Sequence, residues 1–293
     1  MTADHRAGPI RIALLGHGIG SSLSPRLHES EALAQGLTLS YELMDSRDDG
    51  RPLRPRLDEL REHGYAGANI THPHKREVLG LLDEVTPAAR RLGAVNTVLF
   101  TVRGAVGHNT DAPGYAAAFR RHLAGVPTGS VVQTGAGGAG SAVAHAQLAE
   151  GTARLGVFDV DRPRAEALVA DLCDTHGAGR AHLVTDVDAA LAEADGLVNA
   201  SPVGMAHLPG APVDTDRLRP PLWVSDVVYM PVDTELLVAS RARGLRTLSG
   251  IHMCVHQAAL AFELFTGRGA DVDRMTERVA GEAGLRSAGH SHV

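Results

Sequence analysis

The sequence predicts an α/β protein of two domains, and three observations carry that prediction. The chain has 293 residues, about twice the roughly 150 residues of a common single domain. Short apolar runs alternate with amphipathic segments, which indicates strands alternating with helices in a largely parallel sheet. A linker at 124–129 (AGVPTG) precedes a strand, a glycine-rich turn and a helix, which begin a second unit of the same kind.

In the first half of the chain, apolar runs predict strands and the segments between them predict helices. Ser24 and Pro25 form a good helix start, because Ser caps a helix N-terminus and Pro suits its first turn, and Gly36 ends that helix. The remaining helices are expected at 53–63 and 113–123. The strands are expected at 10–15, 37–44, 66–70 and 94–102, the last followed by a turn at Arg103 and Gly104.

The second half of the chain carries a dinucleotide-binding signature. Gly135, Gly137 and Gly140 fit G-x-G-x-x-G between a predicted strand and a predicted helix, and Asp159 ends the next strand. Strand, turn, helix and terminal acid together predict a Rossmann fold. Further strands are expected at 196–199 and 223–228, a long helix at 251–265 before Gly267, and a flexible tail at 286–293.

The glycine-rich turn predicts where a cofactor binds. Glycines let the backbone approach a pyrophosphate, which sits at a helix N-terminus where free N–H groups and the dipole favour anions. The expected contacts are Gly135, Ala136, Gly137, Gly138, Ala139 and Gly140.

Asp159 predicts which dinucleotide is preferred. Its carboxylate would accept hydrogen bonds from the ribose hydroxyls of NAD and would repel the 2′-phosphate of NADP, so NAD is expected and NADP is the alternative. Arg162 and Arg164 follow closely and could partly neutralise that charge. Asp159 could instead cap the next helix, a role for which Asp161 competes.

Composition excludes several classes of protein. A formal net charge of −6 and the lack of a long basic run argue against nucleic-acid binding. Cys173 and Cys254 lack C-x-x-C spacing, and the N-terminal residues contain no apolar run typical of a secretory signal. We therefore expect a cytoplasmic protein whose partner is a small molecule, not a nucleic acid or a membrane.

One lysine stands out. Of the 28 basic residues, only Lys75 is a lysine, and Asn occurs only at 69, 96, 109 and 199. A GC-rich codon bias would explain both counts, since Arg replaces Lys freely on a solvated surface. Arg cannot replace an ammonium that must release its proton, because a guanidinium stays charged. Lys75 is therefore a candidate for chemistry, the alternative being a leftover surface lysine.

The surroundings of Lys75 suggest acid–base chemistry on an alcohol. We expect Lys75 in the first turn of a helix opened near Pro73, where the helix dipole would favour loss of its proton. Asp111 is a candidate partner, and its alternative role is to cap a helix. The hydroxyls of Ser22 and Ser24 could hold a carboxylate, unless Ser24 serves only as a cap.

The neighbouring histidines do not predict a metal site. His72, His74 and His108 lie beside these motifs, but they lack the acid or cysteine spacing of metal ligands. Histidines next to loops are more often satisfied surface groups, so no metal is expected.

Seven sequence motifs resemble those of the shikimate dehydrogenase family, in the same order and over nearly the whole chain. They are GHGIGSSLSPRLH, GANITHPHK, GAVNT, GHNTD, NASPVGM, DVVYMP and the 250–257 stretch, beginning at residues 16, 67, 93, 107, 199, 226 and 250. The resemblance implies an α/β substrate domain, residues 1–112 completed by helices in 250–285. A Rossmann domain, residues 113–249, would be inserted between these parts.

The resemblance also implies roles for individual residues. Lys75 and Asp111 would be the catalytic pair, moving the proton of an alcohol while its hydride passes to the nicotinamide. The substrate-binding residues would be Ser22 and Ser24 for a carboxylate, Asn96 and Gln257 for hydroxyls, and Thr71 and Tyr229 along the pocket. On sequence alone, Asn96 could also be a turn residue. The further cofactor contacts would be Arg164, Asn199, Val228 and Gly250.

Several positions depart from the common family pattern. Gly18, Ser21 and Glu29 stand where many members have Pro, His or Gln, and Asn. Asp159, Val160 and Asp161 stand where NADP-type members carry a phosphate clamp. In this respect the chain is similar to the NAD-dependent quinate/shikimate dehydrogenases of the family. Quinate-preferring members tend to carry Thr where this chain has Ser24, so shikimate is expected as substrate and quinate as a second one.

Other functions stay open on sequence alone. Within the family these are an aminoshikimate-type enzyme of secondary metabolism and an NADP-linked biosynthetic shikimate dehydrogenase. A folate-type dehydrogenase would not need the SSLSP carboxylate cradle at 21–25, and a metabolite-sensing pseudoenzyme would not need Lys75. The resemblance leaves open whether the chain forms a homodimer.

Overall fold

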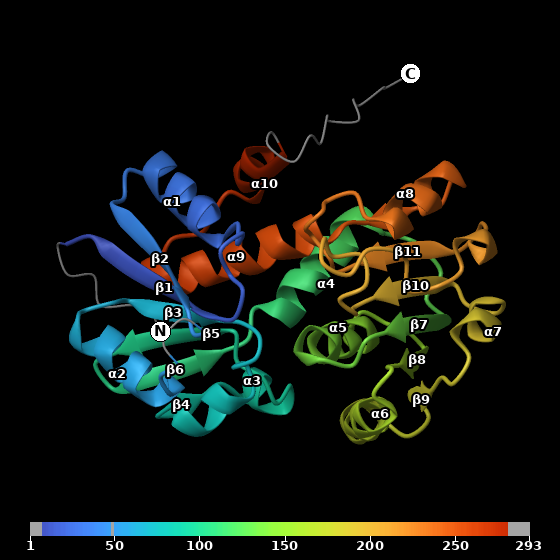
Figure 1. The fold of residues 1–293 in the computed structure, drawn as a ribbon, viewed down its shortest axis with the longest axis horizontal. Helices are drawn as coiled ribbons and strands as arrows, with labels where there is room; N and C mark the ends of the chain where they lie inside the picture. The colour runs from blue at the N-terminus through green and yellow to red at the C-terminus, as the bar shows by residue number, and fades with distance from the viewer. Residues whose placement is uncertain (1–7, 48–49, 281–293) are drawn as a thin grey trace.

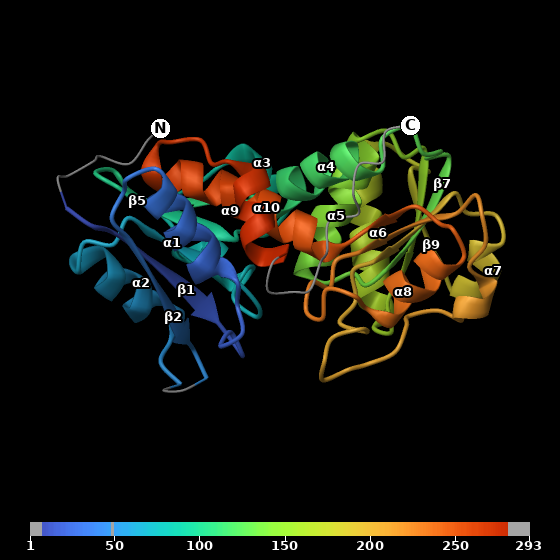
Figure 2. The same ribbon diagram turned by 90° about the horizontal axis from the view of Figure 1, so that it is seen from above.

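The computed structural model describes residues 8–47 and 50–280, which form two lobes, each built on a six-stranded sheet (Figure 1). The predicted tail at 286–293 lies outside the described residues. Two helices, α4 and α9, run between the lobes, and Figure 2 shows them lying along one side of the molecule. In the described part of the chain, no helix is both long and apolar enough to cross a membrane.

The first sheet has the strand order β2-β1-β3-β5-β6-β4 and is mixed. The strands β1, β2 and β3 are parallel, and β5 pairs antiparallel to both β3 and β6. The strands are β1 Ile10–Gly16, β2 Leu39–Asp45, β3 Gly67–Ile70, β4 Glu84–Val85, β5 Thr97–Thr101 and β6 Gly104–His108. The elements around them are α1 Ser24–Ala34, α2 Leu53–Glu62, η1 Glu77–Leu81, α3 Pro87–Arg91, α9 Gly250–Thr266 and α10 Val272–Ala280.

Alternation along β1 explains how this sheet is covered on both faces. Ala13 and Leu15 pack into one core with α2, whereas Ile12 and Leu14 point to the opposite face and pack against α9. A strand with both sets of side chains buried reads as a continuous apolar run, as the sequence IRIALL does. The C-terminal helix α9 therefore completes the N-terminal lobe.

The second sheet is parallel throughout, with the order β12-β11-β10-β7-β8-β9. Its strands are β7 Ser130–Thr134, β8 Arg154–Phe158, β9 Ala181–Leu183, β10 Gly196–Asn199, β11 Trp223–Asp226 and β12 Thr247–Leu248. Its helices are α4 Asp111–His122, α5 Gly138–Ala149, α6 Arg162–His176, α7 Val187–Leu191, η2 Thr215–Arg217 and α8 Glu235–Ala242. This is the Rossmann arrangement that the glycine-rich turn predicts, and β7 leads into that turn.

The helices α4 and α9 approach closely because α4 carries a glycine at the contact. A Cβ added to Gly114 would lie 2.7 Å from the backbone nitrogen of Gln257 and 2.9 Å from its Cα. Real Cβ atoms essentially never come that close to backbone, so only glycine allows this helix pair to pack at this distance. The contact places Gln257 directly beside the first turn of α4.

Candidate active site

The turn that carries Lys75 differs from its prediction. Residues 72–76 form turns, and only Glu77–Leu81 is helical, as a five-residue 3-10 helix. The prediction of Lys75 in the first turn of a helix is therefore wrong, and a helix dipole does not act on it in the way proposed. The cause is the anchoring of the turn: Val95 N–H donates to Lys75 O at 2.8 Å, and His74 N–H donates to Thr71 O at 2.9 Å.

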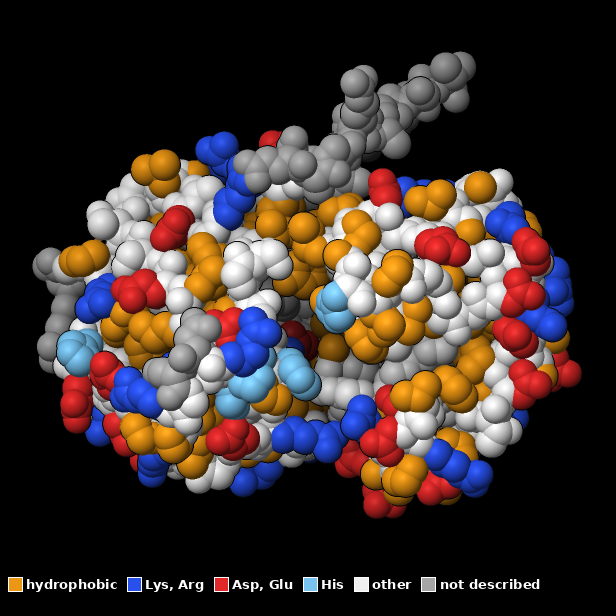
Figure 3. Space-filling view, in the orientation of Figure 1, with side chains coloured by type: hydrophobic (Ala, Val, Ile, Leu, Met, Phe, Trp, Pro, Cys, Tyr) orange, Lys and Arg blue, Asp and Glu red, His pale blue; other side chains and the backbone are white. Residues whose placement is uncertain are grey.

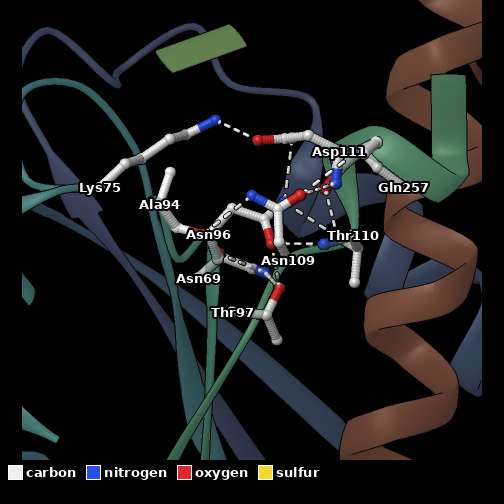
Figure 4. Close-up of polar contacts among 10 residues, drawn as sticks. Asn69, Lys75, Ala94, Asn96, Thr97, Asn109, Thr110, Asp111 and Gln257 are labelled. Carbon is white, nitrogen blue, oxygen red and sulfur yellow. Dashed lines mark hydrogen bonds and ion pairs between the residues drawn. The ribbon is translucent and has the colours of Figure 1, made fainter. Parts of the chain in front are cut away.

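Lys75 and Asp111 meet, as predicted. The Lys75 ammonium Nζ donates to Asp111 Oδ2 at 2.6 Å, and the Lys75 and Asp111 side chains are only 17% and 8% exposed. Figure 4 shows the two side chains end to end. Asn96 Nδ2 donates to the other carboxylate oxygen at 2.9 Å, so Asp111 is held from two sides. Asn96 lies in the bend before β5, but it is only 4% exposed and bonded to Asp111, so its side chain does more than complete a turn.

Asp111 does not cap the helix that it begins. It is the first residue of α4, and Asn109 takes the capping role: Asn109 Oδ1 accepts from the N–H groups of Asp111 (3.0 Å) and Ala112 (3.2 Å). Asn109 Nδ2 donates to Ala94 O at 3.0 Å, which ties the helix start to the loop before Asn96. The Asp111 carboxylate is therefore available for Lys75.

Gln257 reaches the same group of residues from α9. Thr110 Oγ1 lies 3.4 Å from Gln257 Oε1 and accepts from Asn96 Nδ2 at 2.9 Å (Figure 4). Gln257 and Asn96 therefore both contact Thr110, as expected for residues that share one substrate pocket.

Ser22 and Ser24 lie at the start of α1, but neither acts as a helix cap. Leu23 occupies the N-cap position without a side-chain cap, and Ser24 lies one residue inside the helix. The alternative in which Ser24 serves only as a cap is therefore wrong. Ser24 N–H donates to Ser22 Oγ at 3.3 Å, so the two serines are adjacent.

A buried polar chain connects Tyr41, beside Ser24, to the catalytic pair. Burial raises the pKa of Tyr41, the neighbouring Ser24 opposes that rise, and the Tyr41 hydroxyl donates to Asn69 Oδ1 at 2.8 Å. Asn69 Nδ2 in turn donates to Thr97 Oγ1 at 3.0 Å and to Asn96 O at 3.3 Å. Tyr41, which lies next to Ser24, and the Lys75–Asp111 pair are thus two ends of one hydrogen-bonded network.

Tyr229 and Thr71 line other parts of this lobe. Tyr229 is half-buried and packs against the core cluster that joins α1, α9 and α10, and burial raises its pKa. Burial also raises the pKa of the Cys254 thiol to about 12. Thr71 follows β3, and a Cβ on Gly16 would lie 2.2 Å from Thr71 Cγ2, so Gly16 makes room for it.

The glycine-rich turn has the geometry of an anion cradle. Gly135 has φ +95, and a Cβ there would lie 2.5 Å from the carbonyl of Ala200; a Cβ on Gly140 would lie 2.3 Å from Gly135 O. Gly137 precedes the first residue of α5 without a side-chain cap, and a Cβ there would meet no heavy atom within 4 Å. The first N–H groups of α5 therefore face open space, which fits a pyrophosphate.

Asp159 follows β8, as expected, and does not cap a helix. Its Oδ2 accepts from Ala136 N–H at 2.7 Å and its Oδ1 from Asp161 N–H at 2.8 Å, so the carboxylate is fixed beside the glycine turn. Asp161 caps α6, which rules out that role for Asp159. Arg164 pairs with Asp161 at 3.0 Å and Arg162 with Glu166 at 2.7 Å, so both arginines contact carboxylates other than Asp159.

Asn199 and Val228 hydrogen-bond to residues at the ends of the strands next to the glycine-rich turn. Asn199 Oδ1 accepts from Thr134 Oγ1 at 3.1 Å, and Asn199 Nδ2 donates to Asp226 Oδ1 at 2.9 Å. Asp226 Oδ1 also accepts from Val228 N–H at 3.0 Å. Burial raises the pKa of Asp226 to about 6, against the effect of these hydrogen bonds. The side chain of Asn199 is thus used to join strand ends.

Gly250 begins α9 at a close backbone contact. A Cβ there would lie 2.3 Å from Val227 O and 2.6 Å from Val228 O, so only glycine fits. Gly250 therefore lets the start of α9 approach the loop that follows β11.

The two halves of the site face each other across the hollow visible between the lobes in Figure 3. A Cβ added to Gly138, the first residue of α5, would lie 3.7 Å from Lys75 Cδ. The catalytic pair and the glycine turn are therefore in contact range. Among residues 8–47 and 50–280, no cluster of three or more His, Cys, Asp or Glu is arranged to hold a metal ion.

Sequence reasoning missed Asn69, Asn109 and Tyr41, which hold the predicted residues in place. A signal for the two asparagines was present: they belong to a set of only four in the chain. Tyr41 carries no comparable signal, because an aromatic residue in a strand is ordinary.

Comparison with known protein families agrees with these motifs. Residues 14–98 match the shikimate dehydrogenase substrate binding domain, and residues 250–280 match the shikimate 5′-dehydrogenase C-terminal domain.

Individual relatives cover nearly the whole chain. The quinate/shikimate dehydrogenase (NAD(+)) of Corynebacterium efficiens is 46% identical over 91% of this chain and 96% of its own length. The shikimate dehydrogenase (NADP(+)) of Streptomyces avermitilis is 47% identical over 95% of this chain and 98% of its own. Among solved structures, quinate dehydrogenase from Corynebacterium glutamicum in complex with NAD superposes with a TM-score of 0.89. It is 44% identical, over 94% of this chain and all of that one.

Proposed function

Since the chain belongs to the shikimate dehydrogenase family, we propose that it oxidises shikimate to 3-dehydroshikimate with NAD, reversibly, and accepts quinate as a second substrate. The observation that carries the proposal is the Lys75–Asp111 contact of 2.6 Å, placed beside the glycine-rich turn. We assign substrate binding to residues 1–112 with 250–285, and cofactor binding to residues 113–249.

The catalytic pair can move the proton of one alcohol. A substrate hydroxyl set against Lys75 and Asp111 would meet an ammonium that donates and a carboxylate that accepts. When the alcohol is oxidised, its O–H proton passes to this pair and its C–H hydrogen leaves with both bonding electrons. Bound NAD supplies the acceptor for that hydride. Asn96 keeps the Asp111 carboxylate turned toward Lys75 throughout.

The remaining substrate contacts follow from the network. Ser22 and Ser24 would hold the carboxylate, Asn96 and Gln257 would bind ring hydroxyls, and Thr71 and Tyr229 would line the pocket. Ser24 has the smaller of the two hydroxyl side chains found at this position, which supports shikimate over quinate as the better substrate.

NAD is favoured over NADP because neither Arg162 nor Arg164 pairs with the Asp159 carboxylate, which would lie beside the ribose of the bound cofactor. Both of its oxygens accept backbone N–H groups, and the nearby Arg162 and Arg164 pair with other carboxylates. A 2′-phosphate would approach that charge, whereas ribose hydroxyls could donate to it. We assign the pyrophosphate to the turn Gly135–Gly140, with Val228, Asn199 and Gly250 shaping the wall opposite.

The experiment is an assay of NADH or NADPH absorbance with purified protein in four mixtures, pairing shikimate or quinate with NAD or NADP. Reduction of NAD by shikimate, faster than by quinate, is the expected result. Faster turnover of quinate would show that Ser24 is not the discriminator. A preference for NADP would favour the biosynthetic type, as in the Streptomyces avermitilis relative. Turnover in none of the mixtures would contradict the proposal and favour an aminated substrate or a sensor.

A further inference from the structure

His74, the residue before Lys75, has a side chain that contacts two other side chains. The ring of His74 is bonded at both nitrogens: Nε2 lies 2.7 Å from Ser46 Oγ, and Nδ1 lies 2.7 Å from Glu77 Oε2. The His74 side chain is 12% exposed and Glu77 is 52% exposed, so the ring is held by an inner and an outer partner.

The inner partner connects the ring to the ends of two strands. Ser46 follows β2 and is 6% exposed; both its N–H (2.8 Å) and its hydroxyl (3.1 Å) are within hydrogen-bond distance of Gly16 O, the last residue of β1. His74 therefore joins the Lys75 turn to the point where β1 and β2 end. The other side of the turn is joined to Val95 through Lys75 O.

The arrangement of Ser46, His74 and Glu77 has the partners of a hydrolase triad, but not its function. A nucleophilic hydroxyl must be open to substrate and lie near N–H donors for an oxyanion. Ser46 is buried, and the backbone N–H groups nearby are engaged: His17 N–H donates to His72 O, and Gly18 N–H donates to Asp45. The geometry instead suits an anchor.

We infer that His74 is a positioning residue for Lys75, acting through Ser46. Residues 72–76 are not held by an α-helix, so the direction of the Lys75 side chain depends on fixing this turn at both ends. Val95 fixes one end and His74 the other. With the ring in place, the Lys75 ammonium reaches Asp111 at 2.6 Å. The outer contact with Glu77 is solvent-exposed and contributes little to the anchoring.

Two substitutions separate the inner contact from the outer one. In His74→Gln the amide nitrogen lies about where imidazole Nε2 was and can still reach Ser46, whereas in His74→Asn it replaces Nδ1 and reaches only Glu77. Misplacement of a reacting group by about 1 Å costs up to about 100-fold in rate. We therefore expect kcat with shikimate to fall about 10- to 100-fold in His74→Ala and His74→Asn. In His74→Gln it should stay within about three-fold of the wild type, and the KM for NAD should be nearly unchanged in all three.

A second measurement does not depend on activity. Because Lys75 is the only lysine in the chain, protein grown with carbon-13 lysine gives one lysine ε-CH2 signal in an NMR spectrum. The signal should lie away from the position of free lysine in the wild type and His74→Gln, and move toward it in His74→Ala and His74→Asn. His63→Ala is the control, since that ring donates through Nδ1 to Glu59 O and follows α2 beside Arg11 at the start of β1, at the opposite end of the sheet from Lys75.

The results that would overturn the inference are specific. A folded His74→Ala protein with unchanged kcat and an unmoved lysine signal would show that Lys75 needs no such anchor. Equal loss in His74→Gln and His74→Asn, or a loss in Gln alone, would show that Ser46 is not the partner that matters. If His74→Ala fails to fold, the Gln and Asn pair still decides. The kinetic part rests on the proposed function, but the lysine signal would still test the anchor if the wild type did not oxidise shikimate.

Discussion

Asn109 holds the start of α4, and its removal should weaken both stability and turnover. In Asn109→Ala, the N–H groups of Asp111 and Ala112 lose their cap and Ala94 O loses its donor. Loss of a cap costs about 1 kcal/mol, and a buried carbonyl left unpaired costs about 1–2 kcal/mol more. The side chain is 8% exposed, so water does not easily replace it. We expect the free energy of unfolding to fall by about 2–3 kcal/mol in total.

Urea denaturation followed by tryptophan fluorescence would measure this loss. Trp223, the only tryptophan, packs at 5.2 Å between ring centroids against Phe119 of α4, so its emission reports on that helix. The expected kcat also falls, because the Asp111 carboxylate loses its fixed direction. Asn109→Asp keeps the capping oxygen but leaves Ala94 O without its donor, so it should still lose about 1–2 kcal/mol.

The matched control is the cap of a helix remote from the catalytic pair. Asp186 caps α7 through Ala189 N–H at 2.9 Å, so Asp186→Ala should cost about 1 kcal/mol and leave kcat unchanged. A change in Asn109→Ala below about 0.5 kcal/mol, the usual range for surface substitutions, would refute the reasoning. So would an Asn109→Ala protein of full turnover.

Three other substitutions test the cofactor corner, the buried acid and the helix contact. Asp159→Ala should raise the KM for NAD and narrow the gap between NAD and NADP, read from steady-state rates with each; an unchanged ratio would mean that another residue selects the cofactor. Asp226 has a folded pKa of about 6, above its unfolded value, so the folded state binds its proton more tightly and ionisation destabilises it as pH rises. Wild type should therefore lose about 2 kcal/mol relative to Asp226→Asn between pH 4.5 and 7.5 in urea titrations; parallel curves would exclude this. Gly114→Ala puts a Cβ 2.7 Å from Gln257 backbone, so despite its better helix propensity it should destabilise by about 1–3 kcal/mol and raise the KM for shikimate; a more stable variant would contradict the close contact.

The second lobe could be predicted in detail because its signals are local. Gly135 has a positive φ and Gly140 packs against Gly135 O, both within the turn that follows β7, whereas a Cβ on Gly137 would meet no protein atom within 4 Å. One requirement is distant, the close approach of Ala200 to Gly135. The carboxylate of Asp159 likewise follows directly from the end of β8. Because such features depend on residues close in the sequence, the motif predicted both the Rossmann fold and the position of Asp159 beside the glycine-rich turn.

The turn around Lys75 could not be predicted, because its conformation depends on distant residues. Pro73 suggested the start of a helix, but the choice between α-helix and turn is made by a hydrogen bond to Val95 and by the contact of His74 with Ser46. These partners lie 20 or more residues away in the sequence. The prediction that Ser24 caps α1 was wrong for a similar reason: Ser24 lies one residue inside the helix, with Tyr41 of β2 as its neighbour.

Asparagine is scarce in this chain in the same way as lysine. All four asparagines are buried: Asn69, Asn96, Asn109 and Asn199 are 7%, 4%, 8% and 0% exposed. Each uses its amide nitrogen as a donor and its oxygen as an acceptor, three of them around the catalytic pair and Asn199 between strand ends of the second lobe.

Aspartate lacks the donor, and glutamine is one methylene too long for a site packed at this density. A residue that is scarce overall and cannot be replaced chemically is retained where both ends of its side chain are needed. Scarcity therefore identifies the residues that position the catalytic pair as well as the catalytic lysine itself.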